Sequence, residues 1–230
     1  MELEILGDAD EVARRAAALV AEEARAAVAE CGRFSFAVSG GSTPWKMLAH
    51  LAQEDVPWEQ LHLFQVDERV APAGDPDRNL THLEESLLAR APLPKEQLHA
   101  MPVEESDLEA AAQRYARELE ALAGTPPTLD LVHLGLGPDG HTASLVPGDP
   151  VLEVADRDVA LTVHPYQDRR RMTVTFPLIA RARRILWLVT GGSKVEMLGR
   201  LRNADASIPA GRVRSDRALV LADRAASRAA

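Results

Sequence analysis

The sequence predicts an α/β domain over residues 1–230, with a mostly parallel, Rossmann-like sheet and helices on both of its faces. Short β-prone runs alternate with helix-like stretches, which is the pattern of βαβ units. A length of 230 residues with 46% hydrophobic residues suits a single domain with its own core. Each β-prone run also ends in a polar loop. Because ligands of parallel sheets gather at the carboxyl ends of the strands, these loops are the expected site.

The first expected element is an amphipathic helix from Asp8 to Glu30, a stretch rich in Ala, Glu and Arg with apolar residues at helical spacing. Asp8 or Asp10 is the expected N-cap. Cys31 closes the stretch and is expected to be structural. Since it is the single cysteine, an internal disulfide framework and a cysteine-rich metal site are excluded.

Four β-prone runs follow the helix, each with a polar loop after it. They are FSFAV (34–38) before SGGSTP (39–44), LHLFQV (61–66) before DER (67–69), LDLVHLGLG (129–137) before PDGH (138–141), and RILWLVT (184–190) before GGSK (191–194). Helix-like stretches separate these runs. VALTVHP (159–165) and RMTVTF (171–176) predict two more strands, which form an added hairpin or small subdomain on the main sheet.

The composition limits the partners of the chain. Its formal net charge of -9 leaves no basic field over which a nucleic acid or an anionic membrane could bind. The N-terminus has no basic segment followed by an apolar core, and no run of ~18 apolar residues occurs. We therefore expect a cytoplasmic protein, a monomer or a small homo-oligomer, that binds a small molecule at a local anion site.

Two of the loops have the features of anion sites. The first brings four small residues to the point where a strand enters a helix: Gly40, Gly41, Ser42 and Thr43. Exposed N–H groups, the helix dipole and two hydroxyls favour a phosphate there. The alternative is an ordinary turn in which Thr43 caps a helix beginning at Pro44. The second loop is GGSK (191–194). Its Lys194 lies in the first turn of a helix, where a cation is disfavoured unless an anion is present.

Asp139 and His141 are the candidate acid–base pair. The histidine lies on a loop loosened by glycine, and a carboxylate two residues away is placed to orient its ring, as a general base requires. A lone histidine is more often a surface or core residue. That is the interpretation for the histidines outside the loops: His62, His82, His99 and His133.

Three glycines around this pair satisfy G-x-G-x-x-G: Gly135, Gly137 and Gly140. In a dinucleotide site this fingerprint follows the first strand and opens a helix. Here it comes late in the chain and runs directly into His141. We therefore do not interpret it as a dinucleotide site.

Asp67, Glu68 and Arg69 place two acids and an arginine at a strand end. Arg69 is suited to pair with phosphate or sugar oxygens while the acids hold it. A solvated salt-bridge cluster explains the spacing equally well. Three arginines at 169–171 add positive charge, but strand alternation allows at most one or two of them to reach a common site. No metal-ligand spacing is present, so catalysis is expected to be metal-free.

The motifs and their order resemble the 6-phosphogluconolactonase family. The series is SGGSTP (39–44), DER (67–69), GLGPDGHTASLVPG (135–148), RMTVT (171–175) and TGGSK (190–194). The resemblance runs from about Ser35 to the C-terminal ALVLADRAA. It implies the fold of the glucosamine-6-phosphate isomerases and hydrolysis of 6-phospho-D-glucono-1,5-lactone to 6-phosphogluconate in the oxidative pentose phosphate pathway. It implies no cofactor.

The resemblance also implies a role for each matching residue. His141 would draw a proton from the attacking water, and Asp139 would orient it. The phosphate and the rest of the substrate would be bound by Gly40, Gly41, Ser42, Thr43, Asp67, Arg69, Arg171 and Lys194. How phosphate and oxyanion are divided between Arg69 and Arg171 is left open. The chain departs from the family at HPYQDRR (164–170), where a lysine-bearing loop is common, and at Asp77-Arg78-Asn79.

Two other functions fit parts of the pattern. An amino-sugar phosphate isomerase or deaminase shares SGGSTP and DGH, but that family carries a glutamate five residues after the histidine, and here the position is Val146. Arg69 also stands where the deaminases typically have a tyrosine. A non-catalytic sugar-phosphate sensor would keep both anion loops, and the Asp139–His141 pair argues against it.

Overall fold

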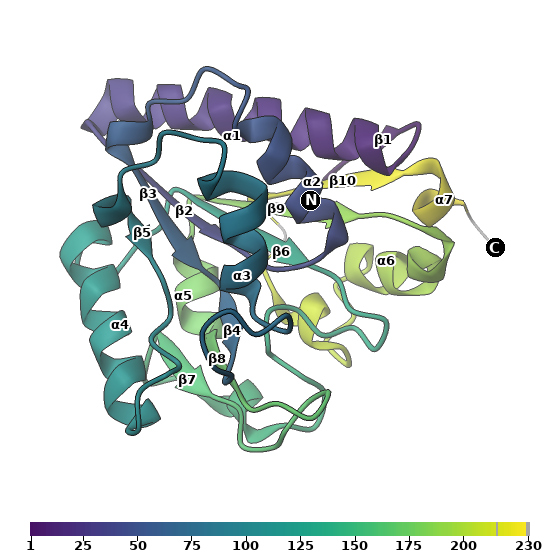
Figure 1. The fold of residues 1–230 in the computed structure, drawn as a ribbon. Coiled ribbons are helices and arrows are strands. Elements are labelled where there is room, and N and C mark those ends of the chain that lie inside the picture. Colours follow the sequence, from purple (N-terminus) through teal and green to yellow (C-terminus); the bar gives the residue numbers. More distant parts are fainter. Residues whose placement is uncertain (215, 229–230) are drawn as a thin grey trace.

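The computed structural model describes residues 1–214 and 216–228, and a seven-stranded sheet forms its centre (Figure 1). The strands lie in the order β1-β10-β9-β6-β2-β3-β5, and all of their pairings are parallel. Their bounds are β1 Glu2–Leu6, β2 Phe34–Val38, β3 Leu61–Gln65, β5 Leu98–His99, β6 Leu131–Gly135, β9 Arg184–Val189 and β10 Ala218–Asp223. The predicted parallel sheet is confirmed, although β1, β5 and β10 were not among the predicted strands.

Helices cover both faces of this sheet, as predicted. They are α1 Ala9–Cys31, α2 Ser42–Leu51, α3 Asn79–Leu83, α4 Leu108–Ala123, α5 Phe176–Arg181, α6 Val195–Arg202 and α7 Arg224–Ser227. One apolar cluster includes residues of α1, α2 and α3, and a second includes residues of α4, α5 and α6. Figure 1 shows α1 and α4 on opposite sides of the strands. Successive side chains of β9 alternate between the clusters: Leu186 and Leu188 join the first, and Ile185 and Trp187 join the second.

The long helix α1 has the predicted boundaries to within one residue. Asp8 is its N-cap, because the Asp8 carboxylate accepts the N–H groups of Asp10 and Glu11, both at 2.9 Å. Gly32 ends it in the left-handed conformation, with φ of 78°. Cys31 is exposed, and its thiol donates to the Ala27 carbonyl at 3.1 Å. No helix in 1–214 or 216–228 is long and apolar enough to cross a membrane.

A second, three-stranded antiparallel sheet lies beside the first, with the order β4-β8-β7. Its strands are β4 Asp67–Arg69, β7 Val159–Leu161 and β8 Arg171–Val174. The predicted hairpin of β7 and β8 is confirmed, but it pairs with β4 and not with the main sheet. The prediction that 67–69 is a loop was wrong. Val66 joins the two sheets, since its N–H donates to Val38 of β2 and its carbonyl accepts from Val174 of β8.

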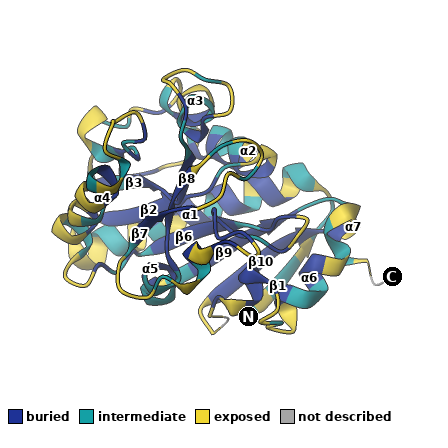
Figure 2. Ribbon diagram, turned by 90° about the horizontal axis from the view of Figure 1, so that it is seen from below, coloured by how far each residue is buried: buried dark blue, intermediate teal, exposed yellow. Residues whose placement is uncertain are grey.

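Burial follows this layered arrangement. In Figure 2 the inner strands are dark blue, whereas the edge strand β1 is not buried, and the outer faces of the helices are largely yellow. Several polar residues are also buried where the two sheets meet, including Asp67, Glu68, Ser144 and Arg171. Buried charges are costly unless they are paired or hydrogen-bonded, so their concentration here makes this the candidate functional region.

Candidate active site

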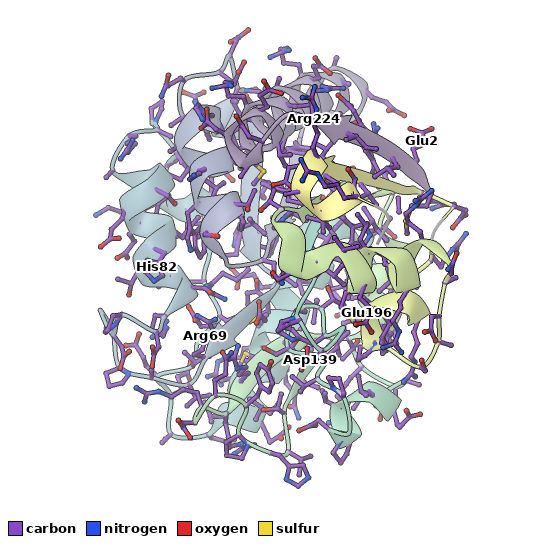
Figure 3. All side chains as sticks on the ribbon, turned by 90° about the vertical axis from the view of Figure 1, so that its right-hand side faces the viewer. Glu2, Arg69, His82, Asp139, Glu196 and Arg224 are labelled. Carbon is purple, nitrogen blue, oxygen red and sulfur yellow. The ribbon has the colours of Figure 1, made fainter. Side chains whose placement is uncertain are left out.

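A cavity of about 290 Å³ opens at the carboxyl ends of β2, β6 and β9. Nine of the ten predicted site residues line it: Gly40, Gly41, Ser42, Thr43, Asp67, Arg69, His141, Arg171 and Lys194. The tenth, Asp139, is hydrogen-bonded to His141. In Figure 3 the labelled Arg69 and Asp139 both lie in the lower half of the molecule, away from the purple α1 at the top. The fold therefore brings together the four loops that the strand pattern singled out.

The first loop delivers backbone donors at the start of α2. The helix begins at Ser42, and Gly41 is its N-cap with φ of 137°, a conformation that favours glycine. No side chain caps it, so the interpretation of Thr43 as the cap was wrong. The Thr43 hydroxyl instead contacts that of Thr190 at 2.7 Å. In the described residues the N–H groups of Ser42 and Thr43 have no acceptor, which leaves two donors and the helix dipole for an anion.

The second loop brings Lys194 to the same cavity. The carboxylate of Asp223 receives the N–H of Gly191 at 3.0 and 3.1 Å and fixes the start of the loop. A 3₁₀ turn over Gly192–Lys194 then leads into α6. The Lys194 ammonium donates to the Leu136 carbonyl at 2.6 Å. Burial lowers its pKa below the usual lysine value, although the charge of Asp139 opposes this shift. Within 1–214 and 216–228 no carboxylate is near enough to form an ion pair with Lys194.

Asp139 and His141 form the predicted pair. The Nδ1 of His141 lies 2.5 Å from the Oδ1 of Asp139, which also accepts the His141 backbone N–H at 3.1 Å. Partial burial opposes ionisation of Asp139, but the charge of His141 and these hydrogen bonds outweigh it and hold the pKa of the carboxyl below its ordinary value. Since an ionised carboxylate only accepts, Nδ1 carries the proton and Nε2 is the basic nitrogen.

The glycines around this pair have a packing role. A Cβ on Gly137 would lie 2.1 Å from the Nδ1 of His141, and a Cβ on Gly140 would lie 2.6 Å from that of Ile208. Gly140 also has φ of 80°. The segment continues into a bridge between Thr142 and Leu145 and not into a helix. The G-x-G-x-x-G match thus reflects close approach of the His141 ring and a tight turn.

The two acids of β4 do different things, and neither holds the Arg69 side chain. Asp67 accepts the hydroxyl of Ser144 at 2.6 Å. Glu68 is fully buried and pairs with Arg78 at 3.1 Å. It also accepts the backbone N–H groups of Arg69, Asn79 and Leu80. The alternative of a solvated salt-bridge cluster was wrong, as was the expectation that the acids clamp Arg69. Its guanidinium donates to the Asp77 carbonyl and lines the cavity.

Of the three consecutive arginines, only Arg171 lines the cavity. Its guanidinium lies 4.0 Å from the Asp67 carboxylate and donates to Gln167 at 3.0 Å. Burial lowers the pKa of Arg171, while Asp67 opposes the shift. Arg169 instead pairs with Asp75 and Asp77 on the surface. The prediction that at most one or two of these side chains reach the site is confirmed.

Sequence reasoning missed several cavity residues, chiefly Asn79, Gln167 and Thr190. Thr190 is polar and directly follows β9, so the rule used for the other strand ends would have found it. Asn79 and Gln167 lie in the segments 77–79 and 164–170, in which no site residue was predicted. The Gln167 side chain accepts a hydrogen bond from Arg171 at 3.0 Å. Asn79 packs so close to Gly40 that a Cβ on the glycine would lie 2.0 Å from the Asn79 side-chain oxygen.

His133 is a structural residue, as interpreted from the sequence, and it supports the first loop. Its Nδ1 accepts the N–H of Ser39 at 3.2 Å, and its ring is fully buried on β6. Burial lowers its pKa to about 3. An unfolded histidine titrates near ~6.5, so below that pH the unfolded state binds a proton that the folded state does not.

We therefore expect the free energy of unfolding to fall as pH decreases from ~6.5, by at most about 1.4 kcal/mol per pH unit from this group. Urea unfolding between about pH 7 and 5, where most carboxylates remain ionised, measures it. His133→Asn keeps a hydrogen-bond acceptor but does not titrate, and it should flatten the dependence. An equal slope in both proteins would show that His133 is not responsible.

Residues 7–221 match a family described as glucosamine-6-phosphate isomerases/6-phosphogluconolactonase. The chain belongs to this family. A 6-phosphogluconolactonase of Synechocystis is 41% identical to it over 81% of this chain and 79% of the relative. One of Mycobacterium tuberculosis is 36% identical over 98% of this chain and 96% of the relative. The crystal structure of a Thermotoga maritima 6-phosphogluconolactonase superposes with a TM-score of 0.85 at 26% identity, covering 96% and 98% of the two chains.

These comparisons confirm the resemblance drawn from the motifs and the fold it implied. The family name covers two kinds of chemistry, isomerisation of an amino-sugar phosphate and hydrolysis of a lactone. Which of them a member performs depends on the groups in its site, since one fold hosts several reactions. In this chain the cavity holds His141, which is hydrogen-bonded to Asp139, and three cations, Arg69, Arg171 and Lys194.

Proposed function

We propose that this chain is a 6-phosphogluconolactonase, which hydrolyses 6-phospho-D-glucono-1,5-lactone to 6-phosphogluconate in the oxidative pentose phosphate pathway. The observation that carries the proposal is a histidine oriented by a carboxylate in the same cavity as three cations, Arg69, Arg171 and Lys194. The names of the relatives support it. Positive charge concentrated in a chain of net charge -9 indicates an anionic ligand at this place.

In this proposal His141 is the general base. Its Nε2 takes a proton from a water molecule while the water oxygen attacks the lactone carbonyl carbon. The negative charge of Asp139 stabilises the imidazolium that forms. When the bond from the carbonyl carbon to the ring oxygen breaks, His141 returns the proton to that oxygen, which becomes the sugar hydroxyl. The product is the open-chain acid.

The remaining groups bind charge. The N–H groups at the start of α2 and the ammonium of Lys194 receive the 6-phosphate. Arg69 and Arg171 lie where they reach either the phosphate or the oxygen of the attacked carbonyl, whose negative charge grows in the transition state. Donors that are already fixed need little reorganisation during the reaction, and the contacts of Arg171 with Asp67 and Gln167 fix its guanidinium.

An isomerase or deaminase needs a proton relay to open and close a sugar ring, and the residue that would extend the relay is absent. Val146, five residues after His141, is buried and does not line the cavity. A pure binding protein would need the cations and the helix N-termini but not a histidine held at 2.5 Å by a carboxylate. Lactone hydrolysis uses all of these groups.

The test follows the disappearance of 6-phosphogluconolactone, generated in situ at neutral pH, with the protein and with buffer alone. Faster loss with the protein is expected, and glucono-1,5-lactone without phosphate should react much more slowly at the same concentration. The same preparation is given glucosamine 6-phosphate, and ammonia release is measured. Ammonia without lactone hydrolysis would favour a deaminase, and no acceleration of either would overturn the proposal. The cytoplasmic location and the oligomeric state remain predictions.

A further inference from the structure

Tyr166 lies at the tip of the β7–β8 connection, in a turn whose backbone is tightly specified. The N–H of Tyr166 donates to the Arg169 carbonyl at 2.9 Å, and the N–H of Arg169 donates back at 3.4 Å. Between them Gln167 and Asp168 have φ of 51° and 62°, so both central residues are left-handed. Glycine and asparagine are the usual residues at such positions. Left-handed backbone in other residues persists where the surrounding contacts hold it, and it concentrates at functional sites.

The side chain of Tyr166 contacts both Asp139 and His141. Its hydroxyl donates to the Oδ2 of Asp139 at 3.2 Å and lies 3.3 Å from the Nδ1 of His141. The two rings meet edge to face, with centroids 5.1 Å apart and an interplanar angle of 66°. Because Nδ1 already donates its proton to Oδ1, the phenol proton goes to Oδ2. Both oxygens of Asp139 therefore accept a hydrogen bond within the site.

The same residue also holds Arg171. The Tyr166 carbonyl accepts from the Nε and Nη2 of Arg171, at 3.3 and 3.2 Å. The Arg171 guanidinium carbon lies 5.1 Å from the centroid of the Tyr166 ring, within the range of a cation–π interaction. Tyr166 thus contacts the Asp139–His141 pair on one side and Arg171, the proposed substrate-binding cation, on the other.

We propose that Tyr166 is a positioning residue that fixes the Asp139–His141 pair and Arg171 relative to one another. The hydroxyl restrains the carboxylate that orients the base, and the backbone carbonyl and ring face restrain the cation. This proposal rests on the lactonase function proposed above. Partial burial and the charge of Asp139 raise the pKa of Tyr166, against the opposing effect of Arg171, so the phenol remains a donor at neutral pH.

Two substitutions of Tyr166 test its contacts with Asp139 and with Arg171 separately. Tyr166→Phe removes only the hydroxyl, so kcat should fall about fivefold, the effect of one net hydrogen bond, while KM and the Kd for 6-phosphogluconate stay unchanged. Tyr166→Ala also removes the ring face beneath Arg171, so KM should rise as well. Tyr115→Phe is the matched control, because Tyr115 is the other of the chain's two tyrosines and donates to the Gln65 carbonyl outside the cavity. It should lower stability and leave kcat at the wild-type value.

A double-mutant cycle tests whether the hydroxyl acts through Asp139. In the Asp139→Asn background, Tyr166→Phe should cause no further loss of kcat. The idea would be overturned by wild-type kcat in Tyr166→Phe, or by the same fold-loss with and without Asp139. Lactone hydrolysis by the wild-type protein is measured in the same assay, so a failure of the proposed function is seen separately.

A spectroscopic titration tests the contact without any activity. In the Tyr115→Phe protein Tyr166 is the remaining tyrosine, and the rise of tyrosinate absorbance with pH reports its pKa. Asp139→Asn in this protein removes a negative charge beside the phenol, so the titration should move to lower pH. An unchanged midpoint would show that Tyr166 and Asp139 do not interact in solution and would overturn the proposal.

Discussion

Replacing His141 with alanine is expected to lower kcat for lactone hydrolysis roughly 10²–10⁴-fold, the range for loss of a positioned general base. The cations and the helix N-termini are untouched, so the Kd for 6-phosphogluconate should change little. The assay uses lactone generated in situ, and the spontaneous rate is subtracted from a buffer blank. Calorimetry with the product measures binding on the same preparation.

Two further variants make the result specific. His164→Ala removes an exposed histidine that does not line the cavity, and it should retain wild-type kcat. Asp139→Asn should resemble His141→Ala, because an amide that donates to Nδ1 moves the ring proton to Nε2 and removes the basic lone pair from the cavity. If His141→Ala retained full turnover, the general-base mechanism would be wrong even if the chain hydrolysed the lactone.

The local hydrophobic pattern was sufficient to predict the helices and strands whose own residues show a clear periodicity. The helix α1 is long, and the strands β2, β6 and β9 are almost entirely buried, so the hydrophobic pattern reveals them. β1 is an edge strand whose residues are exposed or partly exposed, and it pairs with β10 from the other end of the chain, Glu2 opposite Leu219. β4 has three polar residues and becomes a strand only by pairing with β8. Such pairings depend on contacts distant in sequence.

The site was predictable to the level of its loops, since parallel strands bring their carboxyl ends to one edge of the sheet. The hydrogen-bond or ion-pair partner of each side chain could not be predicted. Arg169 and Arg171 are the same residue type two positions apart, and only the strand that begins at Arg171 determines which of them reaches the cavity. Asp67 and Glu68 are neighbouring carboxylates of β4, and consecutive side chains of a strand point to opposite faces, so Glu68 pairs with Arg78 while Asp67 lines the cavity. The position of the Tyr166 side chain depends on a turn with left-handed Gln167 and Asp168, and these residue types do not indicate such a turn.

Replacing Lys194 with alanine is expected to raise the Kd for 6-phosphogluconate and the KM for the lactone roughly 10- to 100-fold, the worth of a charge-assisted hydrogen bond to a phosphate. The kcat should change less, because the lysine meets the phosphate in the ground state and in the transition state alike. Calorimetry with 6-phosphogluconate and with gluconate separates the contributions. The loss should be confined to the phosphorylated ligand, and equal affinity of wild type and variant for 6-phosphogluconate would remove Lys194 from the phosphate site. Lys95→Ala, at an exposed lysine outside the cavity, should behave as the wild type.

The stability of the same variant distinguishes a binding role from a structural one. The Lys194 ammonium is partly buried. Within residues 1–214 and 216–228 it donates to the Leu136 carbonyl rather than to a carboxylate. Its removal should therefore leave the free energy of unfolding without ligand unchanged or slightly higher, since an unpaired buried charge is destabilising. With 6-phosphogluconate present the order should reverse, because stabilisation by a ligand grows with affinity. A variant whose Tm fell equally with and without the ligand would indicate that Lys194 holds the Leu136 segment in place and that its effect on binding is indirect.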